Sequence, residues 1–548
     1  MTLSSPAIPR GPTLVERLPR GSALLVPALL FLLLFYVYPL AQLIGASLPG
    51  GSGKNYALIF SRPVFLRVIA ETFRVSLVVM AVTVLVAFPY AYAMANAGRR
   101  ALLFLTIALL IPFWVSLLLR SFSWIVLLQN TGLVNQVLLG LGLIEKPLKL
   151  IRTEIGVILG MVHVLLPYAV LPLYSVMKKI DMRLMEASSI CGASWFHGFR
   201  RVYLPMALPG VLAAAILTFT LALGFYITPA LLGSPRDMMI AQMIAGQFSE
   251  QLNFGLGAAL AVVLMALTAL AFAVFGLGRA AFAEGRGMMT DRLRKTLFWA
   301  FVCATALFLL VPTLIIVPMS FSAGSRLVFP PEGVSLRWYG KVLSDPDWRA
   351  ALGNSLLVGF ATAVLASALG PAAAMMLNAA SFRGKALVLG FLLSPMVTPV
   401  IVFGVGSYLV FARWGLAGTH AGLIAAHTVL AIPFVLVSVL ASLRMVNPNL
   451  ALASAGLGAS RLFTFRRVTL PLILPGVISG AVFAFITSWD EVVVAMFVAD
   501  TGTRTVPIMI WNQVRTSLDP ATAAVGAILI AVSALGVVLS YTLKESDR

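Results

Sequence analysis

Long runs of hydrophobic residues, separated by short polar stretches, recur along the whole chain. Each run reaches about 20 residues, enough to cross a hydrocarbon core of roughly 30 Å as a helix that rises about 1.5 Å per residue. We therefore expect an all-α membrane protein with about twelve spanning helices in two sets of six. They lie near 22–44, 68–95, 102–126, 156–178, 208–231 and 256–278, and near 297–320, 353–379, 386–411, 421–443, 474–498 and 521–543.

Composition supports the same class of protein. Of the 548 residues, 60% are hydrophobic and 11% are charged, and the mean hydropathy is +1.00, whereas soluble domains carry about 25% charged residues. We expect no soluble domain of useful size. The first run is longer than a usual signal-peptide core, so we expect it to remain as a span.

The formal charge of +20 does not indicate nucleic-acid binding, because the basic residues are scattered between the apolar runs rather than clustered with aromatic residues. Two cysteines far apart in sequence predict no disulfide framework. Four histidines show no metal-ligand spacing, so we expect no metal site.

The distribution of Lys and Arg predicts the orientation in the membrane. Alternate loops hold 23 and 14 of the 39 basic residues, and two more lie within spans. The richer loops are also the shorter ones, so the positive-inside rule places them, and both termini, in the cytoplasm. We expect a multi-pass protein of the bacterial inner membrane.

The chain contains an internal repeat. With a shift of 266 residues, the segment 186–211 aligns with 452–477 and 15 of 26 positions are identical, which indicates duplication. The shift also pairs Gln247 with Gln513. We expect two parallel six-helix halves with a pathway where they face one another. The expected divisions are an N-terminal cytoplasmic segment 1–20, halves 21–278 and 296–543, a cytoplasmic linker 279–295 and a C-terminal tail 544–548.

The repeated segment, at 181–211 and 447–477, is far longer than a turn between spans requires. Asp181 and Asn447 are suitable helix N-caps, and Gly192 and Gly458 permit a sharp bend. We predict a short helix, a turn and a second short helix in each copy, below the membrane.

Two interpretations of this segment remain open. Its arginines suit an interfacial loop that holds lipid phosphates, but its repeated small residues suit close approach by another protein. The residues that we expect to dock a partner are Glu186, Ala187, Gly192, Ala193, Arg200 and Arg201 in the first copy, and Ala453, Gly458, Ala459, Arg466 and Arg467 in the second.

The Glu-Ala pair at 186–187, the Gly-Ala pair at 192–193 and the Leu-Pro pair at 204–205 resemble the EAA loop of binding-protein-dependent importer permeases. In that family, the loop forms a coupling helix that sits in a groove of an ATP-binding subunit. The resemblance implies two copies of an ABC ATPase and a periplasmic substrate-binding protein as partners. Leu452 departs from the pattern, because the family has Glu there, so we expect unequal docking contacts.

Other stretches, such as 130–144, 224–244, 334–359 and 488–500, resemble the polyamine (spermidine and putrescine) branch, as if its two permeases were fused. The resemblance implies polyamine import. Importers of ferric iron, thiamine and 2-aminoethylphosphonate resemble these stretches as well, so these cargoes stay open.

Asp490 and Glu491 lie in the eleventh predicted span, where a carboxylate costs on the order of 3 kcal/mol unless it faces a wet cavity or a partner. They are candidates for the substrate pathway, and Trp489 and Tyr226 could add cation–π contacts to an ammonium group. The competing interpretation is structural: Asp490 caps a broken helix, and Glu491 pairs with Arg74 or Arg120.

The segment 50–55, GGSGKN, lacks the first Gly and the final Ser or Thr of a phosphate-binding loop. We therefore expect no catalytic residues and no cofactor on this chain, with ATP and Mg²⁺ on the partner ATPase. A secondary transporter driven by an ion gradient is the alternative class, supported by the intramembrane carboxylates. A polytopic membrane enzyme would need polar catalytic clusters that the sequence does not show.

Overall fold

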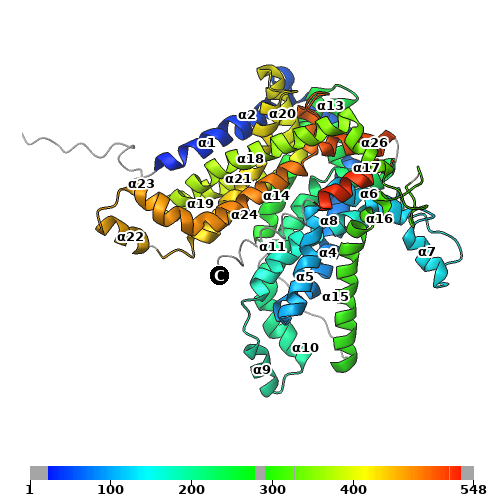
Figure 1. Ribbon diagram of the computed structural model, residues 1–548, viewed down its shortest axis with the longest axis horizontal. Coiled ribbons are helices and arrows are strands. Elements are labelled where there is room, and N and C mark those ends of the chain that lie inside the picture. Colours follow the sequence, from blue (N-terminus) through cyan, green and yellow to red (C-terminus); the bar gives the residue numbers. More distant parts are fainter. Residues whose placement is uncertain (1–21, 278–290, 326, 448, 517–518, 532–548) are drawn as a thin grey trace, which may run out of the picture. The chain divides into compact units, whose positions relative to one another are not determined.

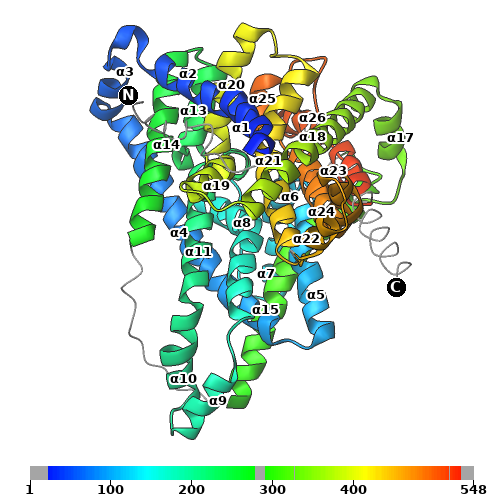
Figure 2. The same cartoon turned by 90° about the vertical axis from the view of Figure 1, so that its left-hand side faces the viewer.

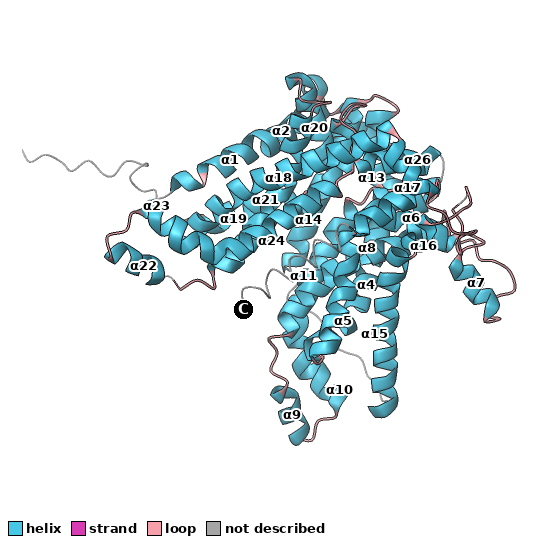
Figure 3. Ribbon diagram, in the orientation of Figure 1, coloured by secondary structure: helices cyan, strands magenta, loops and turns pink. Residues whose placement is uncertain are grey.

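The computed structural model describes residues 22–277, 291–325, 327–447, 449–516 and 519–531. Across these residues the chain is helical, and no strand is formed beyond an isolated bridge between Ser322 and Val334 (Figure 3). This outcome follows from the hydrophobic setting, because a helix satisfies all its backbone hydrogen bonds within one segment.

The first half contains short and long helices in alternation, and Figure 1 labels most of them. Their bounds are α1 Val26–Leu32, α2 Tyr38–Ser47, α3 Lys54–Ser61, α4 Pro63–Asn96, α5 Arg99–Leu110, α6 Leu117–Leu128, α7 Leu133–Gly140, α8 Glu154–Met177, α9 Arg183–Ile190, α10 Trp195–Gly198, α11 Leu204–Leu223, α12 Ile227–Leu232, α13 Ile240–Ser249 and α14 Phe254–Leu277.

The second half repeats this order. Its helices are α15 Asp291–Leu314, α16 Ile316–Ser320, α17 Arg337–Ser344, α18 Pro346–Ala379, α19 Lys385–Leu393, α20 Val400–Trp414, α21 His420–Leu443, α22 Asn449–Gly456, α23 Arg461–Thr464, α24 Leu470–Trp489, α25 Val493–Val498 and α26 Val506–Thr516. A further apolar helix, Ala521–Ala531, follows.

Ten helices of the described residues are long and apolar enough to cross a membrane, and a bent pair brings the number to eleven. The predicted all-α polytopic fold is confirmed. The twelfth predicted span is described as far as residue 531, and its remainder lies outside the described residues, as do the predicted segment 1–20, most of the linker and the tail 544–548.

Two predicted spans are broken rather than continuous. The third is interrupted after α5 by the 3₁₀ turn η5, Ile111–Trp114, before α6 begins. The ninth is broken between Lys385–Met396 and Val400–Trp414. Prolines stand at both breaks, Pro112 in the first and Pro395 and Pro399 in the second; proline donates no N–H and disfavours helix in the residue before it.

Two further hydrophobic runs end earlier as helices than predicted. The run 208–231 ends its long helix at Leu223 and continues as α12, and the run 474–498 ends at Trp489 and continues as α25. Both breaks fall at equivalent places in the two halves, so the duplication extends to the irregular backbone.

The described residues form two compact units that cross the boundary between the halves. Of the described residues, one unit comprises 22–38, Val358–Met396 and Ile424–Ser488, and the other comprises the rest. Thus α1 belongs with helices of the second half. Conversely, α15, the first helix of the second half, packs against α4, α5 and α6.

The larger unit is built around α4, α8 and α11, which pack against one another along their lengths. Figure 2 shows α9 and α10 at one end of this unit and α13 at the opposite end. In the smaller unit, α21 packs against α24: Phe434 and Phe483 stack with ring centroids 6.4 Å apart, and the His427 ring bonds the Ser488 hydroxyl at 2.8 Å.

Candidate coupling loops and translocation site

The first repeated loop has the predicted helix–turn–helix form. α9 ends in a turn where Gly192 has φ +82°, the Gly192 N–H donates to the Ser189 carbonyl, and the Ala193 N–H donates to the Ser188 carbonyl, each at 3.0 Å. This pair of bonds is the Schellman arrangement, which satisfies carbonyls left over at a helix end. Ser194 then caps α10 by accepting from the His197 N–H at 3.4 Å.

The second loop repeats these bonds one for one. Gly458 has φ +81°, and the Gly458 and Ala459 N–H groups donate to the Ala455 and Ser454 carbonyls at 3.0 and 3.1 Å. Ser460 caps α23 by accepting from the Phe463 N–H at 3.2 Å. The two loops therefore share one backbone design.

The predicted capping residues lie two positions before the first residue of each loop's first helix. The Asp181 carboxylate accepts from the Arg183 N–H, and the Asn447 side chain accepts from the Asn449 N–H, both at 3.0 Å. These helices begin at Arg183 and Asn449, slightly later than predicted.

The two short helices of each loop contact one another differently in the two copies. A Cβ atom at Gly198 would lie 2.4 Å from the Ser188 hydroxyl oxygen, so a larger residue there would require this hydroxyl to move. The equivalent residue in the second copy is Thr464, whose hydroxyl bonds that of Ser454 at 2.9 Å. The second copy thus has a hydrogen bond between two hydroxyl groups where the first copy has a close contact between Gly198 and Ser188.

Each loop presents small residues and an apolar tip to its surroundings. Ala187, Gly192, Ala453 and Gly458 are exposed, and the tips are Ile190, 87% exposed, and Leu457, 89% exposed. Where the first copy presents the exposed Glu186, the second presents Leu452 at 69% exposure. The two loops thus share a backbone design but differ in charge and in the position of the apolar tip, because Gly456 is equivalent to Ile190 and Cys191 to Leu457.

An aromatic stack anchors the first loop to the larger unit. The rings of Trp195, Phe199 and Tyr203 stack in succession, with centroids 5.0 and 5.6 Å apart. Tyr92 of α4 meets Tyr203 edge-on at 5.1 Å. Of the predicted docking arginines, Arg200 is half-buried, whereas Arg201, Arg466 and Arg467 are exposed. The predicted docking residues Ala193 and Ala459 are half-buried.

Asp490, the residue that follows α24 in the second half, caps a helix of the first half. Its Oδ1 accepts from the backbone N–H of Leu117, the first residue of α6, at 2.8 Å. Its Oδ2 lies 3.9 Å from the Arg120 guanidinium, which is almost fully buried. A carboxylate at a helix N-terminus is stabilised by the N–H groups exposed there.

Glu491 caps the helix that follows it. Its carboxylate accepts from the N–H groups of Val494 and Ala495 at 2.8 and 2.9 Å, and the residue is buried. Trp489 is partly buried against the core of the larger unit. Arg120 pairs with Asp490.

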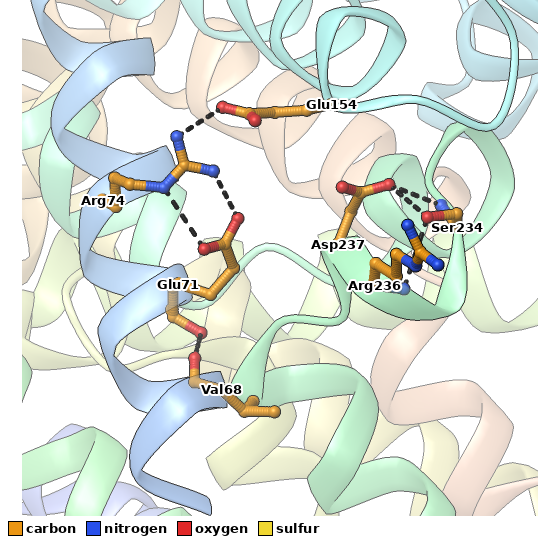
Figure 4. Close-up of polar contacts among 8 residues, drawn as sticks. Val68, Glu71, Arg74, Glu154, Ser234, Arg236 and Asp237 are labelled. Carbon is orange, nitrogen blue, oxygen red and sulfur yellow. Dashed lines mark hydrogen bonds and ion pairs between the residues drawn. The ribbon is translucent and has the colours of Figure 1, made fainter. Parts of the chain in front are cut away.

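Arg74, the other basic residue within a predicted span, pairs with two carboxylates of the first half (Figure 4). Its guanidinium lies 2.5 Å from Glu71 and 2.9 Å from Glu154. The cluster joins α4 to the start of α8, so Arg74 serves packing in the first half. Beside it, Asp237 accepts from the N–H and hydroxyl of Ser234.

Tyr226, the fourth pathway candidate, lines a cavity of about 880 Å³ in the larger unit. Helices from both halves border it, α13 and α26, whose first residues, Ile240 and Val506, are related by the same shift of 266. Asp490, Glu491 and Trp489 are not among the described residues that line it. We refer to it as the α13–α26 cavity.

Matching hydroxyl groups anchor both bordering helices. The backbone N–H of Ile240 donates to the Thr72 hydroxyl of α4, and that of Val506 donates to the Ser355 hydroxyl of α18, each at 2.8 Å. Sequence reasoning missed this pair and the cavity. The pairing of Gln247 with Gln513 was the signal, because it showed that 240–252 and 506–518 are repeated elements.

The duplicated spans, the cavity bordered by both halves and the two exposed loops define a membrane-embedded transport subunit. Residues 22–280 and 369–545 match the family described as the binding-protein-dependent transport system inner membrane component. The chain belongs to this family.

Its relatives include permeases of polyamine systems. The chain is 33% identical over 225 residues to the spermidine/putrescine transport system permease protein PotB of Haemophilus influenzae, covering 40% of this chain and 77% of that protein. It is 32% identical over 249 residues to PotC of the same organism, covering 45% and 96%. A chain of a bacterial alginate ABC transporter matches with a TM-score of 0.41 and 16% identity, over 46% of this chain and 91% of that one.

Several predictions from sequence are thereby confirmed. The chain resembles two such permeases joined, it is a permease subunit of an ABC importer rather than an enzyme, and it crosses the membrane many times. Its family is that of binding-protein-dependent transport systems.

Proposed function

We propose that this chain forms the whole translocation pathway of a polyamine importer and docks two copies of one ABC ATPase. The observation that supports a polyamine as the cargo is the sequence identity of this chain with two polyamine permeases, PotB and PotC. The observation that supports two ATPase copies is the bond-for-bond repetition of the helix–turn–helix loops.

The loops suit docking because their exposed faces combine small side chains with exposed apolar ones, of which Ile190 and Leu457 are the most exposed in each loop. Burial of an exposed apolar side chain contributes about 1.5–3 kcal/mol, and small neighbours let the partner approach closely. The ATP and Mg²⁺ would be bound by the ATPase. The loops and both termini would face the cytoplasm, as the Lys and Arg distribution favours.

Asp490, Glu491, Trp489 and Tyr226 would act in the pathway in different ways. Tyr226 faces the cavity, whereas Asp490 and Glu491 hold the helix starts at Leu117 and Val494. Their charges would favour a cation nearby, but their primary role would be to fix the broken spans. Transport tests can separate these roles.

The decisive experiment is reconstitution. The chain is purified with the ATPase and binding protein encoded beside it, placed in proteoliposomes, and supplied with radiolabelled spermidine or putrescine. We expect uptake that requires ATP, the ATPase and the binding protein, and that unlabelled polyamines suppress.

Other cargoes and the alternative class give different results. Suppression by ferric iron, thiamine or 2-aminoethylphosphonate, with none by polyamines, would replace the proposed cargo. Uptake without ATPase or ATP, abolished by a protonophore, would establish an ion-driven transporter instead.

A further inference from the structure

The α13–α26 cavity has an aromatic and amide floor. Tyr226 and Trp511 are both buried, with ring centroids 5.5 Å apart. Gln247 is 5% exposed, and its side-chain oxygen has no hydrogen-bond partner among the described residues, although its nitrogen donates to Gln251 at 2.8 Å. A buried acceptor without a partner is unfavourable unless a ligand or water supplies the donor.

An arginine occupies the region above this floor. The Arg515 guanidinium carbon lies 5.5 Å from the centre of the Trp511 ring, and a guanidinium nitrogen lies 4.0 Å from the Glu250 carboxylate. The ring face and the carboxylate are the groups that attract an organic ammonium ion. Arg515 therefore sits where such an ion would be held.

These contacts hold Arg515 weakly. The Arg515 and Glu250 side chains are 56% and 70% exposed, so solvent screens their attraction. The charged residues that line the cavity are Arg62, Arg515 and Glu250, which together carry one positive charge in excess. While Arg515 stays in place, the net charge of the lining residues does not favour a cation.

We propose that Trp511, Glu250 and Tyr226 form a subsite for one ammonium group of the transported solute, and that Arg515 fills this subsite until the solute displaces it. Arg515 is thus an internal competitor of the substrate. The proposal rests on the proposed polyamine cargo. The Gln247 oxygen, on the cavity floor, supplies an acceptor for an ammonium N–H.

The test is the KM for spermidine of the reconstituted complex. Arg515→Gln removes the competitor, so we expect KM to fall by about 3- to 10-fold, the range expected when one exposed ion pair and one cation–π contact no longer oppose binding. Arg515→Lys keeps the charge but loses the planar guanidinium that lies over Trp511, so KM should fall less than in Arg515→Gln. Glu250→Gln and Trp511→Leu should raise KM, and Trp511→Phe should raise it less.

Arg349→Gln is the matched control, because Arg349 is an exposed arginine of α18 that does not line the cavity; its KM should equal that of the unaltered chain. Purified yield and basal ATPase rate of each complex report on folding. If Arg515→Gln leaves KM unchanged or raises it while the unaltered complex transports spermidine, the subsite is wrong and the polyamine cargo stands. If the unaltered complex takes up no polyamine, both the cargo and the subsite are overturned.

Discussion

At the scale of single residues, the two intramembrane carboxylates show how charge is accommodated in an apolar setting. Asp490 satisfies the backbone N–H of Leu117 and neutralises the buried Arg120, and Glu491 satisfies two N–H groups of α25. Each carboxylate thus stabilises a helix start that a broken span would leave without acceptors. The carboxylates stabilise the broken spans, and the free N–H groups at the breaks stabilise the carboxylates.

Asp490→Asn tests this dependence. Asn keeps an oxygen for the Leu117 N–H but leaves the Arg120 charge without its partner, so we expect a loss of stability on the order of 3 kcal/mol. The measurement is thermal unfolding of the purified chain in detergent. The double variant Asp490→Asn with Arg120→Gln should recover part of the loss, and an unchanged melting temperature in the single variant would contradict the pairing.

The difference between Glu186 and Leu452 predicts unequal docking contacts. Both residues are exposed at equivalent places, but the carboxylate can pair with a basic group of the ATPase. We expect Glu186→Ala to lower ATP-dependent uptake by about 5-fold or more, as loss of a central interface contact does, and Leu452→Ala to lower it less. Equal losses in the two variants would show that charge at this position is unimportant.

At the scale of elements, the turns at Gly192 and Gly458 fix the angle between the short helices of each loop. Their φ values of +82° and +81° cost a residue with a Cβ atom roughly 1–2 kcal/mol, more if it is β-branched. The space around both glycines is open. A substitution there would therefore act through the backbone and through the docking surface rather than through an internal clash.

We expect Gly192→Val and Gly458→Val each to abolish uptake, because the turn is strained and the added side chain blocks the partner's approach. Gly98→Val is the matched control: its surroundings are equally open and its φ is −65°. Co-purification of the ATPase with each variant measures docking directly. Normal ATPase recovery with both variants would refute the proposed role of the turns.

The hydroxyl anchors of α13 and α26 are a second repeated element. Thr72→Val removes the acceptor for the buried Ile240 N–H, and Ser355→Ala removes that for Val506. Each change leaves one buried donor unsatisfied, which costs about 1–3 kcal/mol. Thermal unfolding should show similar losses for the two variants, and Thr72→Ser, which keeps the hydroxyl, should show a smaller one.

At the scale of the whole molecule, duplication makes one chain equivalent to a pair of permeases. The halves exchange their first helices: α15 packs against α4, α5 and α6, and α1 belongs to the unit that holds α21 and α24. Such an exchange joins the halves more firmly than a flat interface would, because each half contributes to the packing of the other.

This organisation predicts the composition of the assembled transporter. Native mass spectrometry of the detergent-solubilised complex should show one copy of this chain with two copies of the ATPase. A complex with two copies of this chain, or one ATPase per chain, would contradict the assignment of one docking loop to each ATPase. The expected mass is set by the 58.5 kDa chain and the two ATPase subunits.

The sequence by itself determined the class of protein, the approximate place of most apolar spans and the repeated helix–turn–helix loops. These features depend on local or periodic information: apolar runs long enough to cross a bilayer, glycines that allow a left-handed turn, and a segment that occurs twice. Such features can be recognised in the sequence without knowing how the helices pack. For that reason the loops matched the prediction down to the bends at Gly192 and Gly458.

The tertiary structure alone decided which residues meet across long sequence distances. Asp490 contacts Leu117 and Arg120. Ile240 bonds Thr72, and Trp511 lies against Tyr226. These partners depend on how the helices pack and not on spacing in the chain. The breaks in the third and ninth spans were not predicted from the sequence, because they too depend on packing. Their prolines were visible in the sequence, but the side chains and packing that make a broken helix stable come from elsewhere in the fold.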